Sequence, residues 1–409
     1  MYKAQSPDVK RLKAQAIDEC GPGTILADFG VLLDFLGEEG VRSTGKYHLL
    51  PIARLAELDE RMSLPLRPAL KRPQQKSFPH LHAMYLLLRA TELAVPVGQG
   101  KTTGRLVRVP EMVERWQALN PTEQYFNLLE AWLRLATWEV VGEREGWGSN
   151  LALRTRALWM VVPAGGKWFQ EKRLRSEYSF YGFAGQATLA MLELFGLMEV
   201  RRNPPEEGEN WRIEAVRRTP WGEALLPLLF DQCEVKLFDD LAPAAELGAL
   251  QPALQRYYPE WRNNLEFPER KFRPGVYTIT ASLGSVWRRI AAPAEASLDD
   301  LAWCVIEAYE FDGDHLYQFT FVERNGRTVE VECPNVPDAQ LFTDEVAIGD
   351  LPLDVGRSMR LHYDFGADWL FDIKLEQIDS ENKKKITEPT LIASRGKAPP
   401  EYDFDDGEW

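Results

Sequence analysis

Cysteine and histidine are scarce in this sequence of 409 residues, which contains four cysteines and five histidines. The cysteines are scattered, and no two of them form a Cys-x-x-Cys pair. A disulfide framework or a zinc site made of thiolates is therefore not expected. No stretch approaches the roughly 20 apolar residues that a membrane-spanning helix needs, and the N-terminus lacks an apolar signal core. We therefore predict a cytoplasmic protein with no membrane partner.

The best-known sequence signals of enzymes are also missing. There is no P-loop, no Gly-x-Gly-x-x-Gly before a helix, no Gly-x-Ser-x-Gly and no His-Glu-x-x-His. These motifs are the strongest signs of catalysis that a single sequence carries. The sequence therefore predicts no cofactor and favours a protein that is not an enzyme.

The composition is that of a folded protein with several domains. Apolar residues make up 45% of the chain and include 13 tryptophans, and this length exceeds what one ordinary core accommodates. The charge is uneven, with 16 basic and 11 acidic residues in 1–110 but 12 basic and 27 acidic residues in 275–409. A basic front and an acidic back suggest different partners for the two ends, although solubility alone also explains the acidic end.

Two similar octapeptides, "TGKYHLLP" at 44–51 and "TGRLVRVP" at 103–110, organise the first part of the chain. Each follows a segment with apolar residues at helical spacing. Each also precedes a segment that reads as a helix starting at proline. Because the glycine suits a hairpin turn, we predict two copies of a winged-helix-like unit within residues 1–120.

A third winged-helix-like unit is predicted at 175–230, inside a helical region that spans 121–240. A helix runs into the strand "LMEVRRN", a polar tip follows, and "WRIEAVRRT" returns before another helix that starts at proline. Winged helices often bind DNA through basic residues that contact phosphates. The candidate contacts are Arg212, Arg217 and Arg218 on this wing, with Arg72 and Lys76 in the loop at 64–79. Acidic residues at the wing tip leave a protein partner as the alternative to DNA.

The pattern changes after a predicted linker at 241–274. The segment 276–283 alternates as a strand does, and 297–311 reads as a helix capped by Ser297. Asn325-Gly326 marks a hairpin turn. Residues 275–409 therefore predict an α+β domain with a largely antiparallel sheet and an acidic tail. The predicted fold class is a multidomain chain with a mainly α, winged-helix-like N-terminal part and this α+β domain.

Five ordered blocks within residues 276–403 resemble the plasmid pRiA4b ORF-3-like family. They read "VWRRI" with a proline three residues on, "SLDDL", "DGDHLYQF", "YDFGADW" and "GKAPPEYD". The residues that carry the resemblance include Trp287, Arg288, Arg289, His315, Phe319, Tyr363, Asp364, Gly366 and Trp369. The resemblance implies the fold and a loose association with plasmids and mobile elements, but no reaction. Four positions depart from the family pattern, where Tyr317, Ala367, Phe371 and Ala398 replace residues of the family's polar positions.

Within these blocks lies a candidate site. The set consists of His315, Asp364, Asp312, Asp314 and Asp368. Histidine with carboxylates is suited to a divalent metal or to acid–base chemistry. The alternative, which we favour, is that these acids cap tight turns and that the aromatic residues Trp287, Phe319, Phe365 and Trp369 form the core. No metal is predicted, and Arg288 or Arg289 is expected to form a structural ion pair with Asp364.

The preferred function is therefore that of a non-enzymatic interaction protein. Its partner would be DNA, a mobile element or another protein, bound through the winged-helix-like units. The alternative is an enzyme or a ligand-binding protein with its site around His315 and Asp364. A structure discriminates between them: the alternative is supported if these two side chains lie in one open pocket, and it is weakened if they are apart or packed away.

Overall fold

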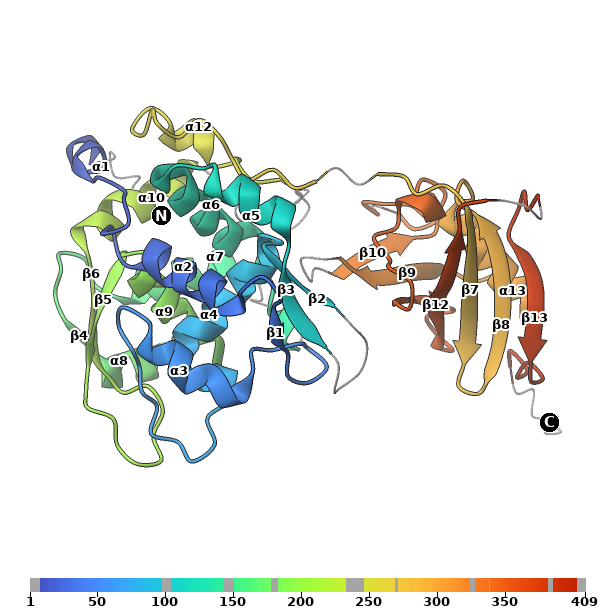
Figure 1. Cartoon of the computed structure of the whole chain (residues 1–409), viewed down its shortest axis with the longest axis horizontal. Helices are drawn as coiled ribbons and strands as arrows, with labels where there is room; N and C mark the ends of the chain where they lie inside the picture. The colour runs from blue at the N-terminus through green and yellow to red at the C-terminus, as the bar shows by residue number, and fades with distance from the viewer. Residues whose placement is uncertain are drawn as a thin grey trace, which may run out of the picture. The chain divides into compact units, whose positions relative to one another are not determined.

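The computed structural model describes residues 8–97, 104–142, 151–177, 183–232, 246–268, 271–323, 328–337, 339–381 and 385–402. The chain divides near residue 267 into two compact units, which are described one at a time (Figure 1). Among the helices of the described residues, none is long and apolar enough to cross a membrane.

The N-terminal unit begins with a set of six elements that closes on a small sheet. In order they are α2 (Ile25–Leu36), β1 (Val41–Arg42), α3 (Leu55–Glu60), α4 (Pro79–Ala90), β2 (Ala94–Val97) and β3 (Arg105–Arg108). The sheet order is β1-β3-β2, and both pairs are antiparallel. Helix α5 (Pro110–Gln117) follows β3 directly and starts with proline, whose missing N–H costs nothing in a first turn.

A second set repeats this order. It consists of α7 (Leu151–Val161), β4 (Phe169–Gln170), α8 (Glu171–Glu177), α9 (Phe183–Leu194), β5 (Met198–Arg202) and β6 (Ile213–Arg218). Its sheet order, β4-β6-β5, matches that of the first set position by position. Helix α10 (Pro220–Gln232) again starts with proline directly after the last strand. The hairpin predicted in the third unit is the β5–β6 pair.

The prediction of two units around the two octapeptides is wrong. Val41 of β1 pairs with Leu106 of β3, so the strand before the first octapeptide and the strand inside the second belong to one sheet. The first octapeptide is a tight loop, closed by two backbone hydrogen bonds between Thr44 and Leu49. What recurs is a longer pattern of element order and strand order, and it relates residues 25–117 to residues 151–232.

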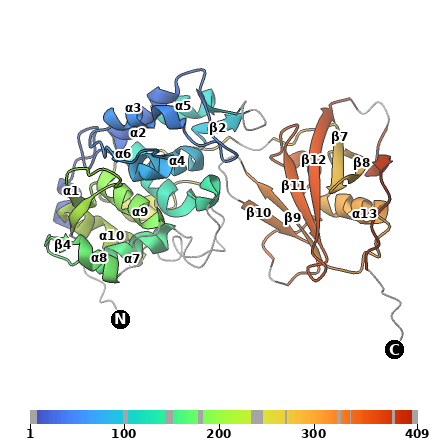
Figure 2. The ribbon, with the colours of Figure 1, turned by 90° about the horizontal axis from the view of Figure 1, so that it is seen from below.

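The third helices of the two sets, α4 and α9, pack against each other, and Figures 1 and 2 show them side by side. All twelve residues of α4 are buried. In a winged helix that reads DNA, this helix must be exposed to enter the major groove. Neither α4 nor the described part of α9 presents such a face, because the packing between the two sets covers it.

The remaining elements of this unit complete its core. They are α1 (Val9–Ala14), η1 (Ile52–Arg54), η2 (Gln75–Ser77), α6 (Pro121–Glu130), η3 (Ala131–Leu135), η4 (Trp138–Val141) and α12 (Gln251–Leu254). Most of the described part of the predicted linker is not a linker, because Leu254, Trp261 and Leu265 are buried in the same core. Phe126 stacks on Trp261 with ring centroids 4.6 Å apart.

The C-terminal unit is an α+β domain with an antiparallel sheet of seven strands, as predicted. The strands are β7 (Val276–Leu283), β8 (Val286–Pro293), β9 (Tyr317–Val322), β10 (Thr328–Glu332), β11 (Ser358–Tyr363), β12 (Trp369–Asp379) and β13 (Thr390–Arg395). Their order is β10-β9-β11-β12-β7-β8-β13. Helix α13 (Leu298–Ala308) covers one face of the twisted sheet (Figure 2), and η5 (Ile348–Asp350) precedes β11.

Local signals at the start of α13 have the predicted effect. The Ser297 side chain accepts a hydrogen bond from the Asp300 N–H, and the Asp300 carboxylate accepts one from the Ser297 N–H. This reciprocal capping satisfies two backbone donors at the helix start. The hairpin turn predicted at Asn325-Gly326 lies outside the described residues.

The predicted aromatic core of this domain is only partly correct. Phe319 is fully buried, but Phe365 is 44% exposed. On β8 the core side is taken by Arg288, whose guanidinium lies 4.6 Å from the ring centre of Tyr309. Strand alternation then places Trp287 on the other face, where Arg289 lies over its ring.

Candidate functional site

Three segments that are far apart in sequence meet at one end of the C-terminal sheet. Tyr363 at the end of β11 pairs with Tyr317 at the start of β9, so the loop before β9 and the turn after β11 lie together. The third segment follows β13 and brings Glu401 and Tyr402 to the same place. These segments are the "DGDHLYQF", "YDFGADW" and "GKAPPEYD" blocks.

The turn after β11 fixes the direction of the Asp364 side chain. Asp364 has a φ of 51°, a left-handed conformation that aspartate tolerates better than most residues. Its Oδ1 atom accepts hydrogen bonds from the N–H groups of Gly366 at 2.9 Å and Ala367 at 3.2 Å. The other carboxylate oxygen, Oδ2, is thereby left for a partner outside the turn.

That partner is the hydroxyl of Tyr402, which also contacts His315. The hydroxyl donates to Asp364 Oδ2 at 2.7 Å and lies 2.6 Å from the Nε2 atom of His315. A hydroxyl has one hydrogen to donate, and here it is donated in the hydrogen bond to Asp364 Oδ2. The Tyr402 oxygen is therefore the acceptor for His315, whose Nε2 atom carries a proton in this arrangement.

Glu401 is held beside this group by a second tyrosine. Its Oε1 atom accepts from the Tyr363 hydroxyl at 2.9 Å, and its Oε2 atom accepts from the Asp312 N–H at 2.5 Å. The Tyr363 oxygen in turn accepts from the Gly313 N–H at 3.0 Å. Glu401, His315 and Asp314 each offer one atom within a space where all three atoms lie within 4.8 Å of one another.

The hydrogen bonds of the site lower the pKa of Asp364 and help to raise the pKa values of Tyr402 and Tyr363. The Tyr402 hydrogen bond, together with the turn's two N–H groups, holds the pKa of Asp364 below its usual range. Burial, and then the hydrogen bond to Asp364, raises the pKa of Tyr402. Burial and Glu401 likewise raise the pKa of Tyr363. At neutral pH Asp364 is therefore charged, and the phenols of Tyr402 and Tyr363 are neutral.

A groove of about 330 Å³ begins at this cluster. Its lining consists of Asp299, Trp303, Gly313, Asp314, His315, Leu316, Tyr317, Cys333, Pro334 and Asn335. The Trp303 ring is 47% exposed, although it is large and apolar. Tyr317 and Thr343 both donate hydrogen bonds to Asp299, which fixes this carboxylate at the groove.

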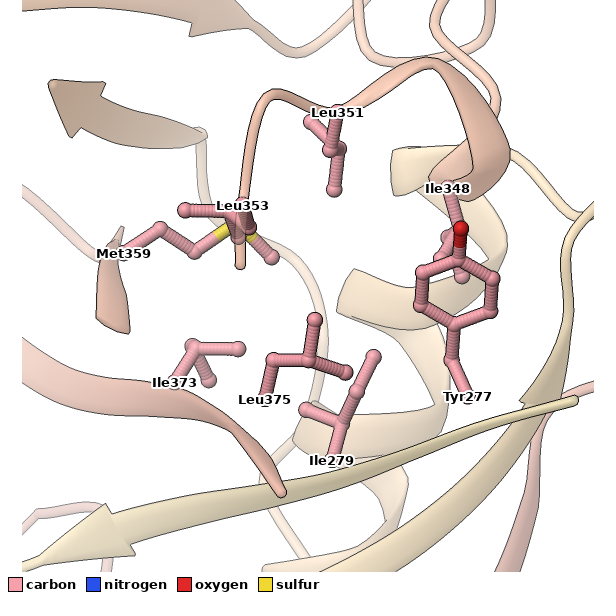
Figure 3. Close-up of a pocket in the computed structure, with 8 residues that line it drawn as sticks. All are labelled: Tyr277, Ile279, Ile348, Leu351, Leu353, Met359, Ile373 and Leu375. Carbon is pink, nitrogen blue, oxygen red and sulfur yellow. The ribbon is translucent and has the colours of Figure 1, made fainter. Parts of the chain in front are cut away.

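A second cavity in this domain is part of the core. Figure 3 shows its eight lining residues, which come from β7, β11, β12 and the segment around η5. It holds about 10 Å³, roughly the volume of one water molecule's probe sphere. Its one polar side chain, Tyr277, donates its hydroxyl hydrogen to the Arg273 carbonyl at 2.9 Å. We assign this cavity to packing and not to ligand binding.

The structure brings together only some of the candidate residues. His315, Asp314 and Asp364 form the cluster, since His315 Nε2 lies 3.1 Å from Asp314 Oδ1 and 3.8 Å from Asp364 Oδ2. Asp312 contributes its backbone N–H. Asp368 is paired elsewhere, with His362 at 2.9 Å.

Sequence reasoning missed Glu401, Tyr402 and Trp303 as members of the site. Glu401 and Tyr402 lie in the closing block of the family pattern, which was the one available signal for them. The ion pair expected between Asp364 and an arginine is wrong. Arg289 pairs with Glu376 at 2.8 Å, and Arg288 donates to the Ala308 carbonyl.

The arginines predicted to contact phosphate are engaged within the N-terminal unit. Arg212 pairs with Glu206 at 2.6 Å and with Glu209 at 2.7 Å. Arg217 pairs with Glu199. Arg218 is buried and donates to the Trp159 carbonyl at 2.7 Å, so its expected role as an exposed contact is wrong.

The wing that carries these arginines is also attached at its tip. The Gly208 N–H donates to the Ala69 carbonyl at 2.8 Å, and the Ala69 N–H donates to the Glu209 carbonyl at 3.1 Å. These two backbone hydrogen bonds attach the tip of the wing to the Pro-rich loop. Arg72 and Lys76 of the same loop are exposed.

Comparison with known proteins places the C-terminal domain in a family. Residues 278–405 match the family model described as plasmid pRiA4b ORF-3-like protein, which confirms the predicted resemblance. The crystal structure of a protein of unknown function, MM3350, from Methanosarcina mazei Go1 is similar at 22% identity and a TM-score of 0.28. That match covers 31% of this chain and 73% of the other. Comparison with the curated proteins gives no match.

Proposed function

We propose that the plasmid pRiA4b ORF-3-like domain of this chain is a binding domain whose groove receives a positively charged organic group. The observation that carries this proposal is that His315, which lines an open groove, is held on its other side by Tyr402 and Asp364. Separate blocks of the sequence supply these side chains, and hydrogen bonds orient them. Such orientation of polar groups at a concave surface is typical of ligand sites.

The chemistry of the groove favours a cation. Asp299 and Asp314 line it, and the whole domain carries an excess of acidic residues. Trp303 presents an exposed ring, and an aromatic face attracts ammonium and guanidinium groups. The best-fitting ligands are therefore an amine or the basic side chain of a protein partner, which keeps the protein in the class of interaction proteins.

The test uses Nα-acetyl-arginine methyl ester as the probe (the arginine ester) and its neutral analogue Nα-acetyl-citrulline methyl ester as the control (the citrulline ester), with binding to the full chain followed by ligand-observed NMR. We expect the arginine ester to bind and citrulline ester to bind much more weakly. Trp303→Ala should remove binding, whereas Trp287→Ala, which alters the opposite face of the sheet, should not. Equal binding of both esters, or full binding by Trp303→Ala, would contradict the proposal.

We also propose that residues 25–117 and 151–232 are two winged-helix-like units that form a scaffold for a macromolecular partner. Their shared element order and sheet order support this assignment, because a winged helix has the same helix–strand–helix–helix–strand–strand order. A protein partner fits better than DNA, since α4 is buried and the arginines of the second wing have acidic partners.

Of the five basic residues predicted to contact phosphate, Arg72 and Lys76 are exposed, and their loop is the route we propose for an association with DNA of a mobile element. Fluorescence anisotropy with a labelled duplex at low salt tests this route. A salt-sensitive complex that is weakened in Arg72→Ala/Lys76→Ala supports it, because each lost phosphate contact flattens the salt dependence. No binding to the duplex at low salt removes DNA and leaves the protein partner.

A further inference from the structure

We infer that Asp314, His315 and Glu401 form a binding site for a divalent transition-metal ion at the rim of the groove. This inference deepens the proposed function. It rests on that proposal only because both sites use the same groove. The three side chains bring two carboxylates and one imidazole, a mixed set of oxygen and nitrogen ligands.

The distances fit a site that closes around an ion. The three ligand atoms lie within 4.8 Å of one another, and His315 Nε2 is already 3.1 Å from Asp314 Oδ1. Around a tetrahedral zinc ion with bonds of about 2.1 Å, ligand atoms are about 3.4 Å apart. Asp314 is 70% exposed, so rotation of its side chain can supply most of the remaining movement.

A second layer of hydrogen bonds positions these ligands, as is usual around protein metal sites. Tyr363 is fully buried and donates to Glu401 Oε1. Asp364 holds Tyr402, whose oxygen contacts His315 Nε2, so an ion at Nε2 would take the place of this contact. Both tyrosines remain neutral at physiological pH, so they act as hydrogen-bond partners and not as ligands.

Binding of an ion through Nε2 requires the other tautomer of His315. In the structure Nε2 carries the hydrogen, and a metal requires the lone pair of that nitrogen. The hydrogen therefore moves to Nδ1 by exchange with solvent, the imidazole stays neutral, and the new bond forms between Nε2 and the metal. Three protein ligands leave further coordination positions, which water or a ligand atom in the groove would fill.

The donor set selects among metals. Imidazole suits zinc and other later transition metals, whereas a hard ion such as Mg²⁺ prefers oxygen ligands and keeps much of its water. We therefore expect affinity to follow Zn²⁺ > Mn²⁺ > Mg²⁺. Mn²⁺ is a useful probe beside Zn²⁺, because it binds thiols poorly and so does not report on the free cysteines Cys20, Cys304 and Cys333.

The domain offers a matched control for this site. His362 and Asp368 form a second histidine–carboxylate pair, with Nε2 and Oδ1 2.9 Å apart. Among the described residues, that pair has no third ligand group within reach. If a single His–Asp pair were sufficient for metal binding, both places would bind; if three groups are needed, only the groove site binds.

The experiment is isothermal titration of the EDTA-treated, dialysed full chain with Zn²⁺ and with Mn²⁺. We expect one site per chain, weakened at least tenfold by His315→Gln and by Glu401→Gln and unchanged in His362→Gln. A Co²⁺ absorption band typical of low coordination number should disappear in His315→Gln and persist in His362→Gln. The absence of binding by the unaltered chain, or equal binding by His315→Gln, would overturn the inference.

The two proposals fail separately. The arginine ester is tested on metal-free protein, so its binding reports on the groove alone. Ester binding without metal binding overturns the metal site and leaves the proposed function standing. Metal binding without ester binding to the unaltered chain overturns the proposed function and leaves the metal site standing. In that case metal binding should also survive Trp303→Ala.

Discussion

His315 and Asp364 are separated in sequence by the three strands β9, β10 and β11, yet His315 Nε2 and Asp364 Oδ2 lie 3.8 Å apart. The Tyr402 hydroxyl lies between them and contacts both. This relationship meets one half of the condition for a site, because the two side chains meet, but only His315 lines the groove and Asp364 is buried. It does not remove the turn role, because the other oxygen of Asp364 caps the turn at the same time.

The double role of Asp364 predicts a graded response to substitution. Asp364→Asn keeps an oxygen for the Gly366 and Ala367 N–H groups, so it should cost less than about 2 kcal/mol in the free energy of unfolding. Asp364→Ala loses those bonds and also places alanine at a φ of 51°, which adds about 1–2 kcal/mol. Calorimetry of both variants measures the difference, and an equal loss of stability would show that the turn bonds contribute little.

Two phenylalanines of the family pattern should differ sharply in importance. Phe319 is fully buried, and Phe319→Ala should cost about 3–5 kcal/mol in the free energy of unfolding of the C-terminal domain. Phe365 is 44% exposed, so Phe365→Ala should cost less than about 1 kcal/mol. Denaturant unfolding of the two variants tests this ranking. A large loss in Phe365→Ala would mean that its contact with the His362 ring stabilises the turn.

The fold of the C-terminal domain could be predicted because its signals are local. Ser297 and Asp300 mark the helix start, and strand alternation marks the sheet. The side that each residue faces was harder to predict. Trp287 looked like a core residue, but Arg288 occupies the core position, because its guanidinium lies over Tyr309 and donates to carbonyls there. A buried arginine with such partners has no signature in the sequence.

The N-terminal unit shows the limit of short repeats. The two octapeptides share a Gly-to-Pro spacing, yet the pairing of Val41 with Leu106 joins their surroundings in one sheet. That contact bridges about 65 positions, and local periodicity carries no information about it. For the same reason Glu401 and Tyr402 were missed, since only the folded chain brings them to His315.

Two glutamates with arginine four residues later offer a comparison of buried and exposed ion pairs. Glu130 is fully buried, pairs with Arg134 at 2.6 Å and accepts from the N–H groups of Gly248 and Ala249. Glu111 pairs with Arg115 at 2.7 Å but is 60% exposed. Glu130→Gln should cost about 3–5 kcal/mol in the free energy of unfolding, and Glu111→Gln less than about 1 kcal/mol.

The Glu130 prediction has a local readout as well. Hydrogen exchange of residues 248–250 should speed up in Glu130→Gln and stay unchanged in Glu111→Gln, because only Glu130 holds these backbone N–H groups. If exchange there is the same in both variants, the segment is held by the burial of Leu250 and Leu254 and not by the carboxylate.

The last prediction concerns acid and the buried ring of His82 on α4. The ring stacks on Trp138 with centroids 5.9 Å apart. Gln75 Oε1 accepts from the Leu50 N–H, so Gln75 Nε2 is left to donate to His82 Nδ1 at 3.1 Å. That donation requires an unprotonated Nδ1. Burial, with a smaller effect of Lys76, lowers the pKa of His82 from 6.5 to about 3.

The lowered pKa fixes the sign of the pH dependence. Above pH 6.5 the ring is neutral in both the folded and the unfolded chain, so its full contribution to stability is present. Between pH 6.5 and about 3 the unfolded chain binds a proton that the folded chain does not, and stability falls as pH falls. At about 1.36 kcal/mol per pH unit, lowering the pH from 6.5 to 4.5 should remove about 2.7 kcal/mol from the N-terminal unit. Urea unfolding of the full chain at these two pH values measures the loss. His82→Gln, which stays neutral, should show a loss smaller by that amount, whereas His48→Gln, at a part-buried position, should keep it. An equal loss in His82→Gln would show that His82 is already protonated when folded and that other groups cause the acid sensitivity.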